Sequence, residues 1–104
     1  MEGKTYTVYI LASKQRGVLY IGFTGNLAAR IWQHKQGVVE GFTKHYMVKK
    51  LVYYELFGEA IIGIQREKQL KKWNRDWKIQ LIEKHNPEWV DLYNKGEILS
   101  LPIQ

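Results

Sequence analysis

Two short segments near the start of the chain have the composition of β-strands. Thr5–Leu11 and Val18–Phe23 are rich in β-branched and aromatic residues, which favour strands. The polar stretch Ser13–Gly17 lies between them and ends in glycine. Because this connection is too short for a crossover between parallel strands, the pattern predicts an antiparallel hairpin.

The rest of the chain combines helical periodicity with one further strand. Asn26 is typical of a helix N-cap, and Gly37 of a helix end. We expect a helix over Leu27–Gln36, a loop over Val38–Tyr46, a strand over Lys50–Leu56, a helix over Glu59–Trp73, a second helix that continues or restarts over Arg75–Lys84, a stop at Asn86–Pro87 and a short closing segment over Glu88–Tyr93. This order predicts an α+β fold, a three-stranded antiparallel β-sheet flanked by α-helices, in a single domain over residues 1–104.

Tyrosines and a glycine stand out in the two hairpin strands. Tyr9 lies in the first strand, and alternation puts Tyr20 and Gly22 on one face of the second. One register that the loop allows sets Tyr9 opposite Tyr20, so that two phenols stand side by side. Tyrosine is also simply a good strand former. Gly22 indicates either the close approach of another backbone or a ligand, or a β-bulge.

Arg30, His34 and Glu67 are expected to face inward from the helices. Arg30 and His34 are four residues apart, so they share a face that overlaps the apolar stripe of their helix. Glu67 falls within the apolar arc of the later helix, where a carboxylate is costly unless it is paired or metal-bound. A salt bridge to Arg30 would satisfy both groups, and a core histidine usually bonds a backbone carbonyl. The pattern therefore fits either a packed interior or a polar site.

Composition adds a basic charge to this picture. Lys and Arg number 16 against 10 Asp and Glu, a formal net charge of +6 at pH 7, which in a small domain favours a polyanionic partner such as DNA. The spacing of Trp73 and Trp77 favours core packing over base stacking. The residues that we expect to contact nucleic acid are Gly22, Lys44, Lys49, Lys50, Lys68, Lys71, Lys72 and Arg75.

The absence of cysteine narrows the chemistry. It excludes disulfides, thiolate zinc sites and cysteine nucleophiles, and the histidines lack the spacing of zinc ligands. The first residues contain no apolar stretch of signal-peptide length, and nothing downstream approaches a membrane span. We therefore expect a cytoplasmic protein with no membrane partner.

The ordered set of motifs resembles the GIY-YIG family of nucleases. Thr7–Tyr9 and Tyr20–Gly22 are similar to the paired GIY and YIG triplets, and Arg30, His34 and Glu67 match that family's arginine, histidine or tyrosine, and glutamate. The resemblance runs over residues 5–92 and looks closest to small single-domain members similar to the nuclease domain of the excision-repair C subunit. The stretches that support this subgroup are Gly41–Lys44, Leu51–Glu55 and Asn86–Trp89.

The resemblance implies a metal-dependent DNA endonuclease with the catalytic residues Tyr9, Tyr20, Arg30, His34 and Glu67. Glu67 would hold one Mg²⁺ or Mn²⁺ ion, Arg30 would bind the phosphate, and one of the tyrosines or His34 would take the proton from water. An unperturbed histidine pKa of about 6.5 suits the last role. Some family members have a lysine after the second triplet and an asparagine near the end of the domain, where this chain has Phe23 and Val90.

Other functions stay open at this stage. One is a catalytically weak or inactive nucleic-acid-binding module of the same fold, which would bind without any metal dependence. Another is an interaction domain for a repair protein or for a second copy of the chain, which would bind DNA weakly and without salt dependence. Repair, recombination and mobile-element processing all fit an endonuclease, as do several DNA structures and RNA.

Overall fold

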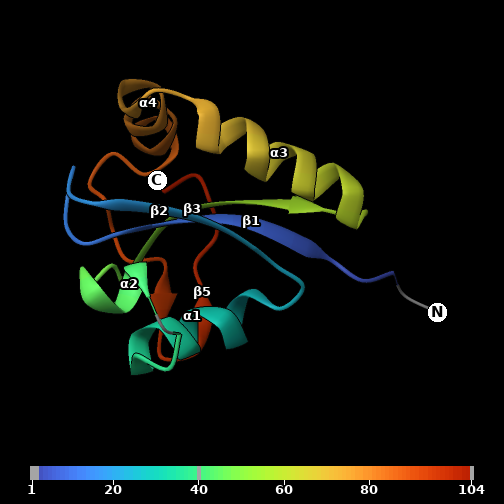
Figure 1. The fold of residues 1–104 in the computed structure, drawn as a ribbon, viewed down its shortest axis with the longest axis horizontal. Coiled ribbons are helices and arrows are strands. Elements are labelled where there is room, and N and C mark those ends of the chain that lie inside the picture. The colour runs from blue at the N-terminus through green and yellow to red at the C-terminus, as the bar shows by residue number, and fades with distance from the viewer. Residues whose placement is uncertain (1–2, 40, 104) are drawn as a thin grey trace.

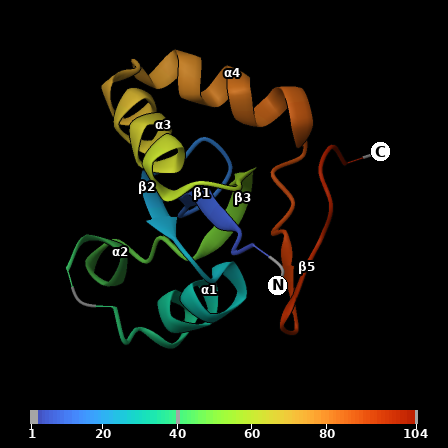
Figure 2. The ribbon, with the colours of Figure 1, turned by 90° about the vertical axis from the view of Figure 1, so that its right-hand side faces the viewer.

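The structure, a computed structural model, describes residues 3–39 and 41–103. Its centre is an antiparallel sheet in the order β2-β1-β3, made of β1 (Tyr6–Ala12), β2 (Leu19–Thr24) and β3 (Lys50–Phe57). As Figures 1 and 2 show, α3 (Ala60–Lys72) and α4 (Arg75–His85) cover one face, and α1 (Leu27–Gln36) and α2 (Phe42–His45) the other. This confirms the expected α+β fold. In the described part of the chain, no helix is long and apolar enough to span a membrane.

Strand alternation divides the core into two layers. Val8 and Ile10 pack with Leu70 of α3 on one face of the sheet. Tyr9 and Leu11 pack with residues of α1 and its surroundings on the other face. The alternation predicted from the sequence therefore places the motif tyrosine Tyr9 on the side of α1.

The segment after α1 contains a helical turn that the sequence did not indicate. α1 itself begins at Asn26, whose side chain accepts a hydrogen bond from the Ala29 amide at 3.2 Å, and ends at Gly37 with a φ of 72°. The loop expected over Val38–Tyr46 is wrong in part, because the residues after Gly41 form α2; residue 40 lies outside the described residues. Gly41 has a φ of 97°, a conformation that suits glycine and lets the chain turn back.

The two long helices are separated by a break at Trp73. Trp73 has an extended backbone, and Asn74 caps α4 by accepting a hydrogen bond from the Trp77 amide at 2.9 Å. Trp73 packs against the core as expected. The expectation for Trp77 is wrong, since this side chain is 53% exposed. Helical spacing holds only along one continuous helix, and the break ends it.

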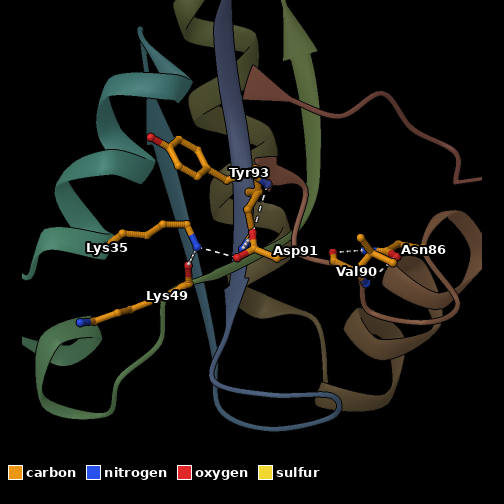
Figure 3. Close-up of polar contacts among 7 residues, drawn as sticks. Lys35, Lys49, Asn86, Val90, Asp91 and Tyr93 are labelled. Carbon is orange, nitrogen blue, oxygen red and sulfur yellow. Dashed lines mark hydrogen bonds and ion pairs between the residues drawn. The ribbon is translucent and has the colours of Figure 1, made fainter. Parts of the chain in front are cut away.

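A C-terminal segment covers the outer edge of β3, as Figure 2 shows. Beyond α4 the chain forms a small hairpin of β4 (Tyr93–Asn94) and β5 (Glu97–Ile98). The Leu51 amide donates to Asp91 at 3.2 Å, and the Leu51 carbonyl accepts from the Leu92 amide at 2.8 Å. Lys35 of α1 pairs with the same Asp91 carboxylate at 2.5 Å (Figure 3). The edge strand is therefore joined to both α1 and the end of the chain.

Asn86, at the end of α4, hydrogen-bonds a backbone group at a bulge in β3. Pairing between β1 and β3 shifts by one residue after Ile10, so that Val52 has no partner in β1. Its carbonyl accepts a hydrogen bond from Asn86 Nδ2 at 3.0 Å, and the same amide group binds the Val90 backbone (Figure 3). Asn86 is fully buried. A bulge leaves a backbone group without a ladder partner, and Asn86 supplies one.

Candidate active site

The two motif tyrosines lie on the α1 side of the sheet, in a register that differs from the predicted one. Tyr9 stands opposite Gly22, and Leu11 stands opposite Tyr20. This register requires glycine at position 22, because a Cβ atom there would lie 2.3 Å from Cζ of Tyr9. The phenol rings of Tyr9 and Tyr20 remain diagonal neighbours with centroids 6.3 Å apart. Gly22 is buried beneath Tyr9, and its expected contact with DNA stays a prediction.

A chain of buried hydrogen bonds joins three elements behind Tyr20. The Tyr9 hydroxyl of β1 lies 3.0 Å from His34 Nε2 of α1, and His34 Nδ1 lies 3.0 Å from Thr43 Oγ1 of α2. All three residues are buried. The His34 ring also stands 5.7 Å from the rings of both Tyr9 and Tyr20. The histidine therefore bridges two side chains instead of binding a backbone carbonyl.

Arg30 adds a positive charge to this cluster from one turn earlier in α1. Burial, together with the neighbouring Arg30, lowers the pKa of His34 to about 4. His34 is therefore neutral near pH 7, which corrects the expectation that its ordinary pKa suits a base. Burial raises the pKa of Tyr9 well above its usual range, with further raising by Tyr20 and Glu67 and an opposing effect of Arg30. Tyr20, Arg30 and Glu67 therefore all affect the pKa of the Tyr9 phenol.

Glu67 reaches the cluster from the opposite layer. Its helix, α3, covers the other face of the sheet, yet its carboxylate acts on the pKa of Tyr9. The side chain is 18% exposed, so the predicted inward orientation is confirmed. Its ion-pair partner is Lys71, at 3.2 Å one helical turn later, and not Arg30, the alternative that the sequence left open. Because Lys71 also lines a pocket with residues of β2, Glu67 lies on the β2 side of α3.

The donor set fits a hard divalent ion held by a single carboxylate. Within residues 3–39 and 41–103, no group of three or more His, Cys, Asp or Glu could hold a metal ion. An ion at Glu67 would therefore be bound mainly by water and substrate phosphate, which is the habit of Mg²⁺. Lys71 is 53% exposed, so its ammonium group is free to move away from the carboxylate. The residues present fit such an ion.

A pocket of about 230 Å³ opens at the β2 edge and connects the two layers. Its lining residues are Leu19, Tyr20, Ile21, Phe42, Lys71 and Lys78. Phe42 of α2 stacks on Tyr20 with centroids 6.3 Å apart, and the Tyr46 ring packs against Phe42 in a tilted geometry at 4.8 Å. The pocket therefore combines a half-exposed phenol with two ammonium groups, which suits a phosphate and its adjoining sugar and base.

The basic residues expected to contact DNA lie in separate places. Lys44, Lys68, Lys71 and Lys72 are exposed on α2 and α3. Lys49 and Lys50 stand at the start of β3, the strand at the other edge of the sheet from β2. Arg75 donates hydrogen bonds to the carbonyls of Arg16 and Gly17, so it holds the β1–β2 loop against α4. Of the expected set, the structure brings Lys71 to the pocket.

Comparison with known proteins identifies the family. A family model described as the GIY-YIG catalytic domain matches residues 5–80. The chain belongs to the GIY-YIG family. Similar relatives include a UPF0213 protein of Clostridium perfringens, 41% identical over 72% of this chain and 80% of the relative, and one of Staphylococcus haemolyticus, 37% identical over 73% and 92%. The GIY-YIG family consists of nucleases that act on DNA and generally use divalent metal ions, so this chain has a nuclease-type domain.

A solved structure of another UPF0213 protein shares the fold. The solution structure of the Bacillus halodurans protein superimposes with a TM-score of 0.53 at 24% identity, covering 89% of this chain and 98% of that one. This GIY-YIG chain therefore has the expected three-stranded antiparallel sheet with flanking helices.

Three residues of the candidate site are absent from the set expected to act in catalysis or DNA binding. Thr43 bonds His34, while Phe42 and Lys78 line the pocket. Phe42 and Thr43 belong to the Gly41–Lys44 stretch that served only as a subgroup signature. A threonine and an aromatic residue carry no chemical signal by themselves, and α2 was not expected. Lys78 belongs to the lysine-rich stretch, where spacing alone does not separate it from its neighbours.

The two departures from the family pattern have structural roles here. Phe23 points to the α3 side, where it stacks on Tyr6 at 5.8 Å and fills the space above Gly63. It therefore lies on the opposite face from Tyr9. Val90 is 37% exposed and bonds Asn86 through its backbone. Neither position supplies a polar group to the candidate site.

Proposed function

We propose that this chain is a metal-dependent endonuclease that hydrolyses phosphodiester bonds in DNA, in repair, recombination or mobile-element processing. The observation that carries the proposal is the cluster of Tyr9, Tyr20 and His34, whose rings lie 5.7–6.3 Å apart, with His34 hydrogen-bonded to the Tyr9 phenol and with Arg30 and Glu67 close enough to influence the pKa of that phenol. These side chains come from two strands, β1 and β2, and from helices on both faces of the sheet. A neutral core would not need a carboxylate, a guanidinium and two phenols around one point.

The groups match the needs of phosphodiester hydrolysis. An activated water must attack phosphorus, the phosphate charge must be neutralised, and the leaving oxygen must be stabilised. Glu67 would hold the divalent ion, which supplies charge neutralisation when bound. Arg30 would bind a phosphate oxygen. Tyr9 and His34 are buried, whereas Tyr20 is half-exposed and lines the pocket, so Tyr20 is the phenol nearest to solvent and substrate.

The pocket residues support DNA as the substrate. Lys71 and Lys78 would contact phosphates on either side of the scissile bond, and Phe42 would contact the neighbouring base or sugar. Lys71 has a second role in this proposal, because it pairs with Glu67 in the absence of substrate. On binding, Glu67 would hold the metal ion and Lys71 would bind the phosphate, so that two ionic contacts would replace one ion pair.

The test is metal-dependent cleavage of a panel of labelled duplex, nicked, branched, flapped and single-stranded DNA. We expect wild type to cut at least one substrate with Mg²⁺ or Mn²⁺ and none with EDTA. Glu67→Gln should lower the rate by roughly 100-fold or more, since metal stabilisation of charge is worth several kcal/mol. Glu59→Gln, at the exposed start of the same helix, is the matched control and should cut like wild type.

The Glu67–Lys71 ion pair and the buried Tyr9 also fit a binding module of the same fold. In that case wild type would cut nothing, and its affinity for DNA would still fall steeply with salt. Glu67→Gln would bind DNA as tightly as wild type or more tightly, because a negative charge leaves the basic surface. That pair of results would reject the endonuclease and support the module.

A further inference from the structure

Thr43 is the last member of a hydrogen-bond chain that begins at Tyr9. The Tyr9 hydroxyl lies 3.0 Å from His34 Nε2, and Thr43 Oγ1 lies 3.0 Å from His34 Nδ1. Thr43 is 3% exposed. Both nitrogens of the imidazole are therefore engaged inside the protein.

The hydrogen bonds of His34 to Tyr9 and to Thr43 depend on each other, because they share one imidazole ring. Burial and Arg30 lower the pKa of His34 to about 4, so the ring is neutral at ordinary pH. A neutral imidazole has one N–H group and one bare nitrogen. If Nδ1 carries the proton, it donates to Thr43, and Nε2 accepts from Tyr9. If Nε2 carries the proton, it donates to Tyr9, and Thr43 must donate to Nδ1.

These two arrangements differ in which part of the Tyr9 hydroxyl group faces the candidate site. When the phenol donates its proton to Nε2, its lone pairs point outward and can accept a hydrogen bond from a water molecule. When the phenol accepts from Nε2–H, its own proton points outward and can only be donated. The partner of Nδ1 therefore decides whether Tyr9 meets the substrate as an acceptor or as a donor.

The hydroxyl proton of Tyr9 favours the first arrangement. Among the residues that the structure describes, His34 Nε2 is the hydrogen-bond partner of the Tyr9 hydroxyl. A phenol is a stronger hydrogen-bond donor and a weaker acceptor than an aliphatic hydroxyl, so the bare nitrogen is better matched by Tyr9 and the N–H group by Thr43. Thr43 can then act as the acceptor of Nδ1–H, because a threonine hydroxyl both donates and accepts.

Thr43 is held firmly enough for this role. The next residue toward the N-terminus, Phe42, stacks on Tyr20. The Thr43 carbonyl accepts a hydrogen bond from the Val48 amide at 2.9 Å. The short helix α2 is therefore attached to the sheet on one side and to the following chain on the other, with the Thr43 hydroxyl turned inward.

We propose that Thr43 is a positioning residue that fixes His34 in the Nδ1–H form, so that Tyr9 presents an acceptor to the attacking water. This rests on the proposed nuclease function, and it extends that function to a residue on α2. Thr43 touches neither the substrate nor the reacting atoms. It acts through His34.

The test combines the histidine tautomer with cleavage kinetics. Nitrogen-15 NMR of the resting protein distinguishes the Nδ1–H form from the Nε2–H form of a neutral imidazole. We expect wild type to hold the Nδ1–H form. Thr43→Val removes the acceptor at nearly constant volume and should move His34 toward the Nε2–H form. It should also lower kcat roughly 10- to 100-fold, the loss typical when a partner that orients a functional imidazole is removed, with a smaller change in KM.

Two variants separate this role from simple packing. Thr43→Ser keeps the hydroxyl and should restore both the Nδ1–H form and most of kcat. Thr7→Val removes a hydroxyl at another buried threonine, in β1, and should leave both readouts as in wild type. An Nε2–H form in wild type, or an unchanged tautomer and kcat in folded Thr43→Val, would overturn the proposal. Because NMR needs no substrate, a wild type that cuts no DNA would reject the nuclease and still leave the tautomer measured.

Discussion

Gly22, the smallest residue of the candidate site, provides the space in which the buried Tyr9 phenol lies. A Cβ atom at position 22 would stand 2.4 Å from the Tyr9 hydroxyl oxygen, well inside van der Waals contact. Glycine in a strand costs roughly 0.5–1 kcal/mol relative to alanine, but here it gives the Tyr9 ring its space. The ring in turn holds its hydroxyl 3.0 Å from His34. Gly22 therefore serves the site through packing.

The buried imidazole makes stability depend on pH. Folding lowers the pKa of His34 to about 4, and an unfolded histidine has a pKa of about 6.5. Between these values the unfolded chain binds more protons, so stability is full above the upper value and is lost as the pH falls toward the lower one. We expect the free energy of unfolding, measured with urea, to decrease with a slope approaching about 1.4 kcal/mol per pH unit.

Substitution of the histidine isolates this effect. His34→Gln cannot take up the proton, so its stability should vary less than that of wild type over the same pH range. His45→Gln, on the exposed side of α2, is the control and should keep the wild-type slope. Equal slopes for wild type and His34→Gln would show that another group causes the acid sensitivity.

At the scale of elements, the rotation of α3 is determined by a cluster on the far side of the sheet. Arg66 makes two hydrogen bonds to Glu55 of β3, at 2.8 and 3.0 Å. Tyr53 donates to the same carboxylate at 2.6 Å, and the Arg66 guanidinium lies 5.1 Å from the Trp73 ring centre. Consecutive helical residues point about 100° apart. Holding Arg66 toward β3 therefore turns Glu67 toward β2 and the candidate site.

We expect Glu55→Gln to affect both stability and metal dependence. Loss of the charged acceptor should lower the free energy of unfolding by about 1–3 kcal/mol, the range for hydrogen bonds to charged groups. A looser α3 should also raise the Mg²⁺ concentration needed for half-maximal cleavage, which a metal titration measures. Glu97→Gln, on the exposed hairpin, should change neither. A stability loss with an unaltered Mg²⁺ requirement would mean that the cluster supports the fold alone.

Local signals in the sequence predicted the helices and strands. Strand register and the exposure of single side chains depend on packing, and local signals did not predict them. Caps act within one turn and alternation within one strand, so α1 and the faces of β1 follow from the sequence. The pairing of Tyr9 depends on the space above Gly22, and the exposure of Trp77 depends on a break between helices. Both are tertiary effects. The roles of the catalytic candidates stay predictions, although the ordered motifs were enough to name the residues that converge.

Thr43 shows why part of the candidate site escaped prediction. Its hydroxyl meets His34 only because α2 turns it inward, and that turn depends on the left-handed backbone of Gly41. A glycine followed by mixed polar residues indicates a loop as readily as a helical turn. The Glu67–Lys71 pair escaped for a different reason. Both residues were candidates, but the sequence also allowed Arg30 as the partner of Glu67.

At the scale of the whole molecule, the two edges of the sheet differ. The C-terminal segment covers the outer edge of β3, whereas the pocket of the candidate site opens at β2. Asp91 is central to the covered edge, because it binds Lys35 and accepts from the amides of Leu51 and Tyr93 (Figure 3). One carboxylate therefore joins α1, β3 and the end of the chain.

We expect Asp91→Ala to destabilise the whole domain without altering the chemistry. Two amides and an ammonium group would lose their acceptor, which should lower the free energy of unfolding by about 1–3 kcal/mol. Thermal and urea denaturation measure this. Glu88→Ala, an exposed carboxylate three positions earlier, should have little effect. A kcat that collapses in fully folded Asp91→Ala would contradict this division between scaffold and site.

The covered edge also has a consequence for how the protein is made. Asp91 follows Leu51 by 40 positions, so a ribosome adding roughly 5–20 residues per second needs about 2–8 s to supply it. During that interval the nascent sheet has a bare edge strand, to which another unfinished chain can add a strand of its own. Newly made copies are therefore most exposed to aggregation in the seconds before residue 91 is added.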